Sequence, residues 1–205
     1  MTRDAFDKQF LNDKVRLLCG VDEAGRGPLA GAVFAAAVIL PADFYMEEIN
    51  DSKALTEKKR EALFPVIQEK ALAFSISRVE ETVIDEINIL NATMLAMREA
   101  ICGLSLTPDL ILVDGNISRG LPEPNLCIKK GDSLSQTIAA ASILAKVARD
   151  RYCKEELAVA FPDYHFEKHK GYGSKAHCEL IRKLGPCQAH RKSFLTKILS
   201  REGAL

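Results

Sequence analysis

The sequence has no net charge, no Cys-x-x-Cys pair and no long hydrophobic run. Its 28 basic residues balance 28 acidic ones, and its six cysteines are scattered, several within apolar stretches, where they are expected to be small buried hydrophobes rather than bridges or zinc ligands. The N-terminus lacks the apolar core of a signal peptide, and the longest apolar stretch, residues 30–40, is too short to cross a bilayer. These absences argue against a membrane role and predict a cytoplasmic protein.

Repeats, low-complexity tracts and linkers are absent as well. The 205 residues are 47% hydrophobic and 27% charged, which is typical of one globular domain with a sizeable core. We therefore expect a single domain over residues 1–205, with its core in residues 15–160 and a helical part in residues 161–205.

The charges are segregated along the chain. Residues 164–205 hold nine bases and three acids, whereas residues 43–99 hold seven bases and twelve acids. The basic segment indicates either a polyanionic partner or an ordinary solvated pair of helices, and charge alone supports both equally.

Hydrophobic periodicity predicts a mixed α/β fold. Strands are expected at residues 15–21, 29–40, 73–79, 110–115 and 125–129, the first two forming a hairpin. Helices are expected at residues 57–68, 81–101, 135–160 and 175–184, and from residue 193 onward. This order of elements favours a mixed sheet flanked by helices.

The end of the first expected strand carries two carboxylates and a glycine-bracketed arginine. Asp22 and Glu23 offer metal-binding oxygens, Arg26 offers a phosphate-binding cation, and Gly25 and Gly27 indicate a sharp exit from the strand. Because successive strand side chains point to opposite faces, the two acids are expected to share one site only if the strand geometry breaks between or just after them. A solvated surface turn is the alternative for an isolated acidic pair.

Two further acids lie where a strand end and a loop deliver side chains to the same sheet edge. Asp114 ends the strand at residues 110–115, and Asp132 follows Gly131. Hard divalent cations bind carboxylate oxygens and keep several waters, so four convergent acids could hold two ions, and such ions would offset the repulsion between the acids. Taken singly, Asp114 could be a turn residue and Asp132 a helix N-cap.

In this context the chain resembles ribonuclease HII, the type 2 ribonuclease H family. The similarity runs through the segments DEAGRGPLAG (22–31), DSKALT (51–56), VDG (113–115), GD (131–132), AASILAKVARD (140–150) and HKGYGS (169–174). Type 3 enzymes carry a different glycine motif and a large N-terminal domain. The resemblance implies a ribonuclease H-like, five-stranded mixed sheet flanked by helices, with a helical C-terminal extension.

The resemblance also implies an activity. It is the endonucleolytic hydrolysis of RNA in RNA/DNA hybrids and incision 5′ to single ribonucleotides in duplex DNA, leaving 3′-hydroxyl and 5′-phosphate ends. Asp22, Glu23, Asp114 and Asp132 are then the expected catalytic and metal-binding residues, with two Mg²⁺ or Mn²⁺ ions. The expected partners are RNA/DNA hybrid and ribonucleotide-containing duplex DNA, bound by a monomer.

Selection of RNA requires a contact to the 2′-hydroxyl. The resemblance assigns this contact to backbone groups of Gly25, Arg26 and Gly27, and it assigns to Tyr172 stacking on the adjacent deoxyribose. A half-buried core tyrosine is the alternative for Tyr172. The other expected substrate contacts are Lys53, Ser142, Lys146 and Lys170.

Other interpretations concern single motifs. Ser142, Lys146 and Arg149 share one helix face, and an ordinary solvated stripe is the alternative for Arg149. The tetrapeptide at residues 131–134 matches the nucleophile motif of GDSL esterases, in which Ser133 would attack an ester, but the Asp-x-x-His pair that this chemistry needs is absent. A nuclease-like fold that only binds nucleic acid is disfavoured because all four acids are present.

Overall fold

In a computed structural model, which describes residues 2–50 and 52–200, five strands form one mixed sheet in the order β3-β2-β1-β4-β5. The strands are β1 (Leu18–Ala24), β2 (Val33–Ile39), β3 (Ala73–Val79), β4 (Leu110–Asp114) and β5 (Asn125–Ile128). β2 pairs antiparallel with β1 and β3, whereas β4 pairs parallel with β1 and β5. The predicted mixed sheet and the predicted hairpin are confirmed.

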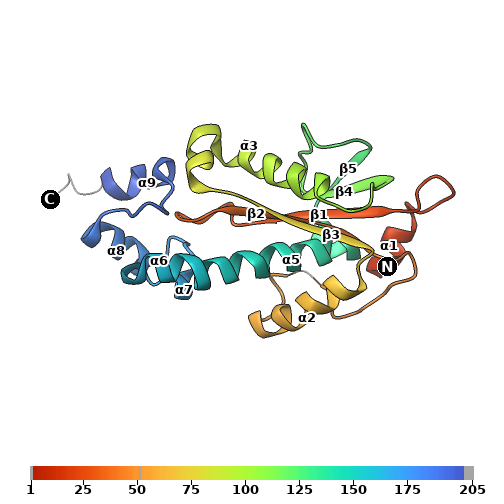
Figure 1. The fold of residues 1–205 in the computed structure, drawn as a ribbon, viewed down its shortest axis with the longest axis horizontal. Helices are drawn as coiled ribbons and strands as arrows, with labels where there is room; N and C mark the ends of the chain where they lie inside the picture. The colour runs from red at the N-terminus through yellow and green to blue at the C-terminus, as the bar shows by residue number, and fades with distance from the viewer. Residues whose placement is uncertain (1, 51, 201–205) are drawn as a thin grey trace.

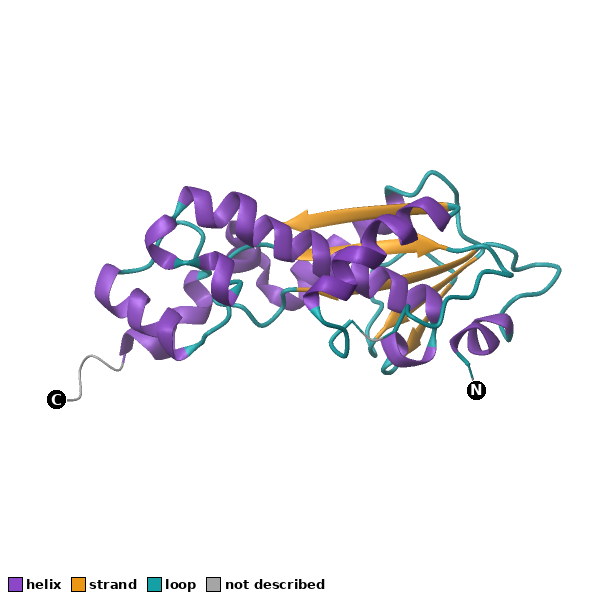
Figure 2. Cartoon of the chain, turned by 90° about the horizontal axis from the view of Figure 1, so that it is seen from below, coloured by secondary structure: helices purple, strands orange, loops and turns teal. Residues whose placement is uncertain are grey.

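Helices cover both faces of the sheet (Figure 1). α3 (Glu81–Cys102) packs on one face and α5 (Gln136–Tyr152) on the other, with α2 (Glu57–Lys70) outside α5. The remaining α-helices described are α1 (Arg3–Lys8), α4 (Gly131–Leu134), α6 (Ala158–Ala160), α7 (Phe166–His169), α8 (Lys175–Leu184) and α9 (Lys192–Leu199), and a 3-10 helix spans Pro162–Tyr164. Figure 2 shows the C-terminal helices gathered at the end of the molecule opposite the N-terminus. Of the helices described, none combines the length and apolar character that a bilayer crossing requires.

Strand alternation divides the core into two layers. Odd-numbered residues of β2 pack beneath α3, and even-numbered ones pack beneath α5. β1 follows the same rule, with Cys19 and Val21 in the layer under α3. On the α5 side Gly20 has no side chain, and a Cβ there would lie 2.2 Å from the backbone carbon of Thr137. The first turn of α5 therefore packs directly on β1, two residues before Asp22.

Three predicted elements have wrong bounds. The strand expected at residues 15–21 is displaced by three residues, to Leu18–Ala24. The helix expected at residues 135–160 ends at Tyr152, where a π-helical turn, Cys153–Leu157, redirects the chain into the apolar cluster of the C-terminal part. The strand expected from residue 29 begins at Val33. The carbonyl groups of residues 30–32 bond to the buried side chains of Arg149 and Arg191 instead of to a neighbouring strand.

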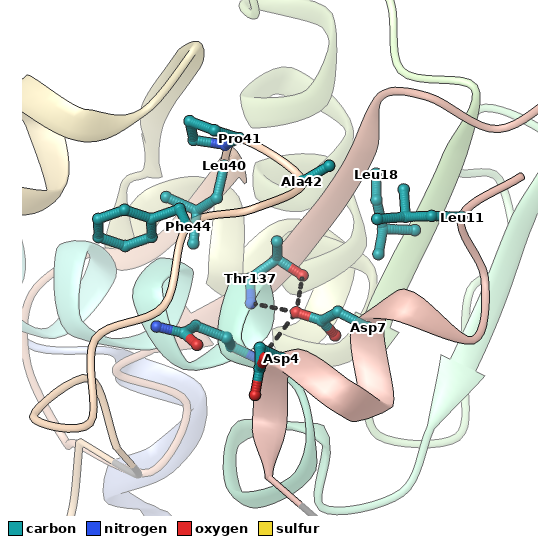
Figure 3. A pocket seen from close by; sticks show the side chains of 10 residues that line it. Asp4, Asp7, Leu11, Leu18, Leu40, Pro41, Ala42, Phe44 and Thr137 are labelled. Carbon is teal, nitrogen blue, oxygen red and sulfur yellow. Dashed lines mark hydrogen bonds between the residues drawn. The ribbon is translucent and has the colours of Figure 1, made fainter.

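A carboxylate on α1 caps the start of α5 (Figure 3). Asp7 Oδ2 accepts hydrogen bonds from the backbone N–H groups of Gln136 and Thr137 at 2.9 and 3.0 Å. The first N–H groups of a helix have no partner within it, so Asp7 supplies the missing acceptor. Burial raises the pKa of Asp7, although these hydrogen bonds favour its charged form. Because α4 with Asp132 immediately precedes α5, the cap also helps to fix a predicted site residue.

Replacing Asp7 with alanine is expected to lower the free energy of unfolding by about 1–3 kcal/mol, because two buried N–H groups lose their acceptor. Asp7→Asn keeps one carbonyl oxygen and should have a smaller effect. Urea unfolding followed by circular dichroism measures both changes. Asp4→Ala is the control, since Asp4 pairs with the exposed Lys8 of its own helix and makes none of the hydrogen bonds that cap α5. Equal losses for Asp7→Ala and Asp4→Ala would contradict the capping role.

Candidate active site

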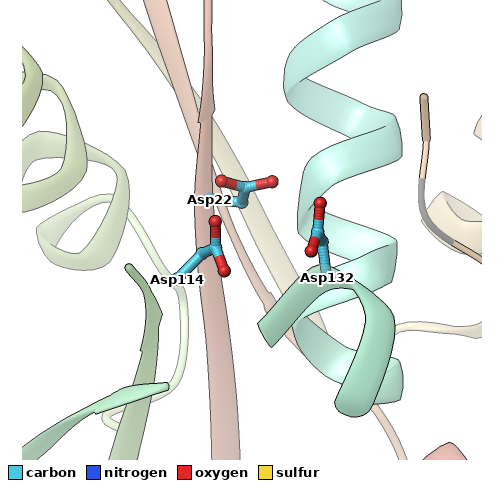
Figure 4. A group of neighbouring side chains, drawn as sticks. All are labelled: Asp22, Asp114 and Asp132. Atoms are coloured by element: carbon cyan, nitrogen blue, oxygen red, sulfur yellow. The ribbon is translucent and has the colours of Figure 1, made fainter. Parts of the chain in front are cut away.

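Asp22, Asp114 and Asp132 converge at the carboxyl edge of the central strands (Figure 4). β1 and β4 run parallel with Val21 opposite Val113, so Asp22 and Asp114 follow at the same level of the sheet. Asp132 approaches from α4, where the N–H of its neighbour Gly131 donates to Asp114 Oδ1 at 2.6 Å. One carboxylate oxygen of each acid lies within 4.8 Å of the other two. The structure thus brings three of the four predicted acids together.

Glu23 borders this group from the other face of β1. The strand stays regular through Ala24 and turns at Gly25, where φ is 98°. Asp22 faces α5, where the Ser142 hydroxyl favours its charged form, whereas Glu23 pairs with Arg26 at 3.3 Å beside α3. Glu23 nevertheless lines the same cavity of about 240 Å³ as Asp22 and Asp114.

Burial and mutual repulsion raise the pKa values of these acids. Asp22 is 3% exposed, and its pKa is raised well above the usual value by burial first and then by the charges of Glu23 and Asp114. Burial also raises the pKa of Glu23 against the opposing effect of Arg26, and burial together with Asp132 raises that of Asp114. A buried negative cluster of this kind needs protons or cations to be tolerated.

Protein cations compensate this cluster weakly. Lys53 Nζ lies 3.2 Å from Asp132 Oδ2, but the lysine side chain is 77% exposed to water. The donor set instead fits a hard divalent cation, because the three acids offer carboxylate oxygens and the cavity leaves room for water ligands. A cation bound there would offset the repulsion that raises the pKa of Asp22 and Asp114.

Most predicted substrate residues line this cavity. Its wall includes Gly25, Arg26, Gly27, Lys53, Ser142, Lys146 and Tyr172. Ser142 is buried and shares a hydrogen bond of 2.8 Å with Ser52 Oγ, which attaches the 52–56 segment to α5; Asp51 lies outside the described residues. Lys170 is not part of the wall, and its ammonium group donates to the carbonyl of Glu167.

The aromatic and basic side chains near the cavity differ in exposure. Tyr172 is 43% exposed, so it is not a core tyrosine. Lys146 pairs with Asp150 at 2.6 Å in the cavity wall. Arg149 is fully buried, and the solvated stripe considered for it is wrong. Arg191, equally buried, was missed by the sequence analysis because no motif or periodicity distinguished it from the surface bases around it.

The esterase hypothesis has no supporting geometry. Ser133 is exposed, and its hydroxyl donates to the carbonyl of Lys130 at 2.8 Å. Its neighbour Asp132 belongs to the acidic group instead. Two of the histidines, His177 and His190, are buried in the C-terminal part with their Nε2 atoms 3.0 Å apart, and no histidine is among the residues that line the cavity.

Known proteins are similar to this chain over most of its length. The model of the family Ribonuclease HII matches residues 19–197. Ribonuclease HII of Aliivibrio fischeri is 58% identical over 198 residues, which are 95% of each chain. That of Caldicellulosiruptor bescii is 54% identical over 194 residues, 95% of this chain and 94% of the relative. The crystal structure of ribonuclease H2 from Pyrococcus horikoshii OT3 is similar over 92% of this chain and 100% of that chain, with a TM-score of 0.72 and 25% identity.

The raised pKa of Asp22 predicts how stability depends on pH. Asp22 keeps its proton to a higher pH in the folded protein than in the unfolded chain, where its pKa is near 3.8. The metal-free protein should therefore lose stability as the pH rises from about 3.8 through the raised pKa of the folded state. Asp22→Asn removes this loss and should raise the melting temperature at pH 7 in EDTA, by about 2–4 °C for each kcal/mol gained. Thermal melts at several pH values measure both effects.

The control for this experiment is Asp13→Asn, because Asp13 is exposed and belongs neither to the converging acids nor to the residues that line the cavity. It should change neither the melting temperature nor its pH dependence. Addition of Mg²⁺ should stabilise the wild type more than Asp22→Asn, since ligand binding to the folded state raises stability. A lower melting temperature for Asp22→Asn than for the wild type in EDTA would contradict the predicted repulsion.

Proposed function

This chain belongs to the ribonuclease HII family and is therefore an endoribonuclease, and we propose that it hydrolyses the RNA strand of RNA/DNA hybrids and cuts duplex DNA 5′ to a single embedded ribonucleotide. The observation that carries this proposal is the convergence of Asp22, Asp114 and Asp132 beside a cavity walled by basic side chains and a glycine-rich backbone. Hydrolysis of the bond between the phosphorus and the 3′-oxygen would leave 3′-hydroxyl and 5′-phosphate ends.

In this proposal Asp22, Glu23, Asp114 and Asp132 hold two Mg²⁺ or Mn²⁺ ions. Such ions lower the pKa of an attacking water and neutralise the charge that develops on the phosphate. The protein itself holds the acids in position: the Glu23 N–H donates to Asp22 Oδ1 at 2.7 Å, and the Gly131 N–H holds Asp114. The acids are therefore fixed by the backbone before substrate binds, which reduces the entropy lost on reaching the reactive geometry.

Lysines around the cavity would bind the phosphate backbone. Lys53 is exposed at the acidic group, and Lys146 lies in the wall, partly neutralised by Asp150. Lys170 is the weakest of the predicted contacts, because its ammonium group is turned to the Glu167 carbonyl outside the wall. Phosphate contacts of this kind carry no base information, so we expect cleavage without sequence preference and binding that weakens with salt.

Gly27 and Tyr172 would bound the space that the sugar enters. A Cβ added to Gly27 would lie 3.9 Å from Tyr172 Cε1, in van der Waals contact with the ring, so glycine keeps the space beside the ring open. We place the ribose 2′-hydroxyl against the backbone of residues 25–27 and the neighbouring deoxyribose against the Tyr172 ring. One chain supplies every residue of this site and its described cysteines are free thiols, in keeping with a monomer in the cytoplasm.

The decisive experiment is cleavage of a labelled DNA duplex that contains one ribonucleotide. The purified protein with Mg²⁺ or Mn²⁺ should cut it at the 5′ side of that residue, and EDTA should stop the reaction. Asp114→Asn should fold but lose most of its activity. Loss of a group that only supports a metal ligand lowers activity about 10–100-fold, and loss of a ligand itself should lower it further. The control Asp13→Asn should cut at the wild-type rate. Cleavage that survives full chelation would refute the metal-dependent mechanism.

Tyr172→Ala is expected to lower kcat/KM on the single-ribonucleotide duplex about tenfold or more, because the apolar contact of an aromatic ring with the sugar is worth about 1.5–3 kcal/mol when fully buried. Tyr172→Phe retains the ring and should stay close to the wild type. Steady-state kinetics on the same duplex measure both variants. Tyr45→Ala, which removes an exposed tyrosine outside the cavity wall, is the control. An unchanged rate for Tyr172→Ala would remove this residue from the site.

A further inference from the structure

Two arginines next to the cavity are completely buried. Arg149 on α5 and Arg191, which directly precedes α9, are each 0% exposed. In the described part of the chain, all of their hydrogen bonds go to backbone carbonyl groups. A buried cation costs free energy unless polar groups surround it, and here carbonyl dipoles from one short segment supply most of that compensation. The arginines and that segment therefore fix each other.

Arg191 occupies the inner side of the turn at residues 25–31. Its Nη2 donates to the carbonyl of Gly25 at 2.7 Å, and its Nη1 donates to those of Arg26 and Pro28 at 3.0 and 2.9 Å. Its Nε donates to the carbonyl of Gly31 at 2.9 Å. A planar guanidinium with five donors can hold four carbonyls in this way, whereas an ammonium group cannot. Burial and the neighbouring Arg149 lower the pKa of Arg191 to about 9, so it remains charged at neutral pH.

The geometry of the peptide bond directs two N–H groups away from Arg191. In a trans peptide the C=O of one residue and the N–H of the next point in opposite directions, and the peptides here are trans. The carbonyls of Gly25 and Arg26 point inward, so the N–H groups of Arg26 and Gly27 point outward. Both residues line the cavity, and neither N–H has an acceptor among residues 2–50 and 52–200. The turn therefore offers two unused donors on the cavity side.

Arg149 binds the C-terminal end of the segment that begins at Gly25, and it also binds the part of the cavity wall that carries Tyr172. It donates to the carbonyls of Ala30 and Ala32, and through Nη1 to that of Lys170 at 3.1 Å. Its guanidinium carbon lies 5.7 Å from the centre of the Tyr172 ring. A Cβ on Gly25 would lie 2.0 Å from Arg149 Nε, so glycine is needed at this contact. The two arginines thus keep the unused donors and Tyr172 at a constant separation.

Building on the proposed function, we propose that Arg191 is a positioning residue that presents the N–H groups of Arg26 and Gly27 to the substrate 2′-hydroxyl and so sets the discrimination between ribose and deoxyribose. A hydroxyl oxygen accepts hydrogen bonds from such donors, whereas a deoxyribose leaves them unpaired. Arg191 itself touches neither the sugar nor the acids. It acts through the backbone of the turn.

The test measures selectivity in Arg191→Lys and Arg191→Gln. For each variant, kcat and KM are determined on a duplex with one ribonucleotide, and the same duplex with deoxyribose throughout is used as a competitive inhibitor. We expect the ratio of its inhibition constant to KM to fall about 10–100-fold, while the inhibition constant itself changes by less than about twofold. Arg16→Lys, at an exposed arginine before the other end of β1, is the matched control and should keep the wild-type ratio.

A purely structural role of Arg191 would give a different result. Loss of correctly folded protein lowers the apparent kcat and leaves both KM and the inhibition constant unchanged. That outcome, or a wild-type ratio in folded Arg191→Lys, overturns the inference. Circular dichroism establishes which variants fold.

A second measurement does not require an Arg191 variant to fold. In ¹⁵N-labelled Asp114→Asn protein, the amide resonances of Arg26 and Gly27 should shift on addition of the ribonucleotide duplex and not on addition of the deoxyribose duplex. The Arg191 Nε–H signal should also persist in D₂O, as expected for a buried and hydrogen-bonded donor. An equal response of these amides to both duplexes, or rapid loss of the Arg191 signal, overturns the inference.

Failure of this inference can be told apart from failure of the proposed function. A wild-type protein that cuts neither RNA/DNA hybrid nor the ribonucleotide duplex overturns the proposed function and the inference with it. A wild-type protein that cuts both, together with an Arg191→Lys variant of unchanged selectivity, overturns the inference alone.

Discussion

Repulsion between buried carboxylates is the constraint on which the site depends. Parallel pairing of β1 and β4 places Asp22 and Asp114 at the same level of the sheet, and α4 adds Asp132. Burial first and then the neighbouring negative charges raise the pKa values of Asp22 and Asp114, so the folded protein carries an unfavourable charge cluster in the absence of cations. Hydrogen bonds from backbone N–H groups keep the acids in place despite this repulsion. The cluster therefore offers three preformed carboxylate ligands that could hold a metal ion.

α5 connects this cluster to the rest of the molecule. Its first turn packs on β1 at Gly20 and is capped by Asp7 from α1. These contacts fix both the position of the helix along the strands and its distance from the sheet. Further along, the same helix carries Ser142 and Lys146 in the cavity wall and then Arg149 beneath it. One helix thus sets the distance between the acids and the opposite wall with Tyr172, which the sugar and phosphate of the proposed substrate would have to match.

Backbone peptide groups stabilise both the negative and the positive charges at the site. N–H groups stabilise the acids, whereas carbonyl groups surround Arg149 and Arg191. Because both ends of a peptide group are polar, a turn whose carbonyls bind a buried cation offers its N–H groups on the other side. The turn after β1 therefore links the C-terminal part of the chain to the proposed ribose contact, although Arg191 is distant from Gly25 in sequence.

The sequence by itself determined the order of the strands and the main helices, because hydrophobic period and turn residues act over a few neighbouring positions. It also identified the family, and with it the acids, since these stand in short motifs. Only the tertiary structure decided which side chains are buried and what they contact. Arg149 and Arg191 bond mostly to carbonyls more than 100 positions away, and the packing of α3 and α5 decides which helix covers Asp22 and which covers Glu23. Such contacts depend on the packing of whole elements, and no local pattern of residues encodes them.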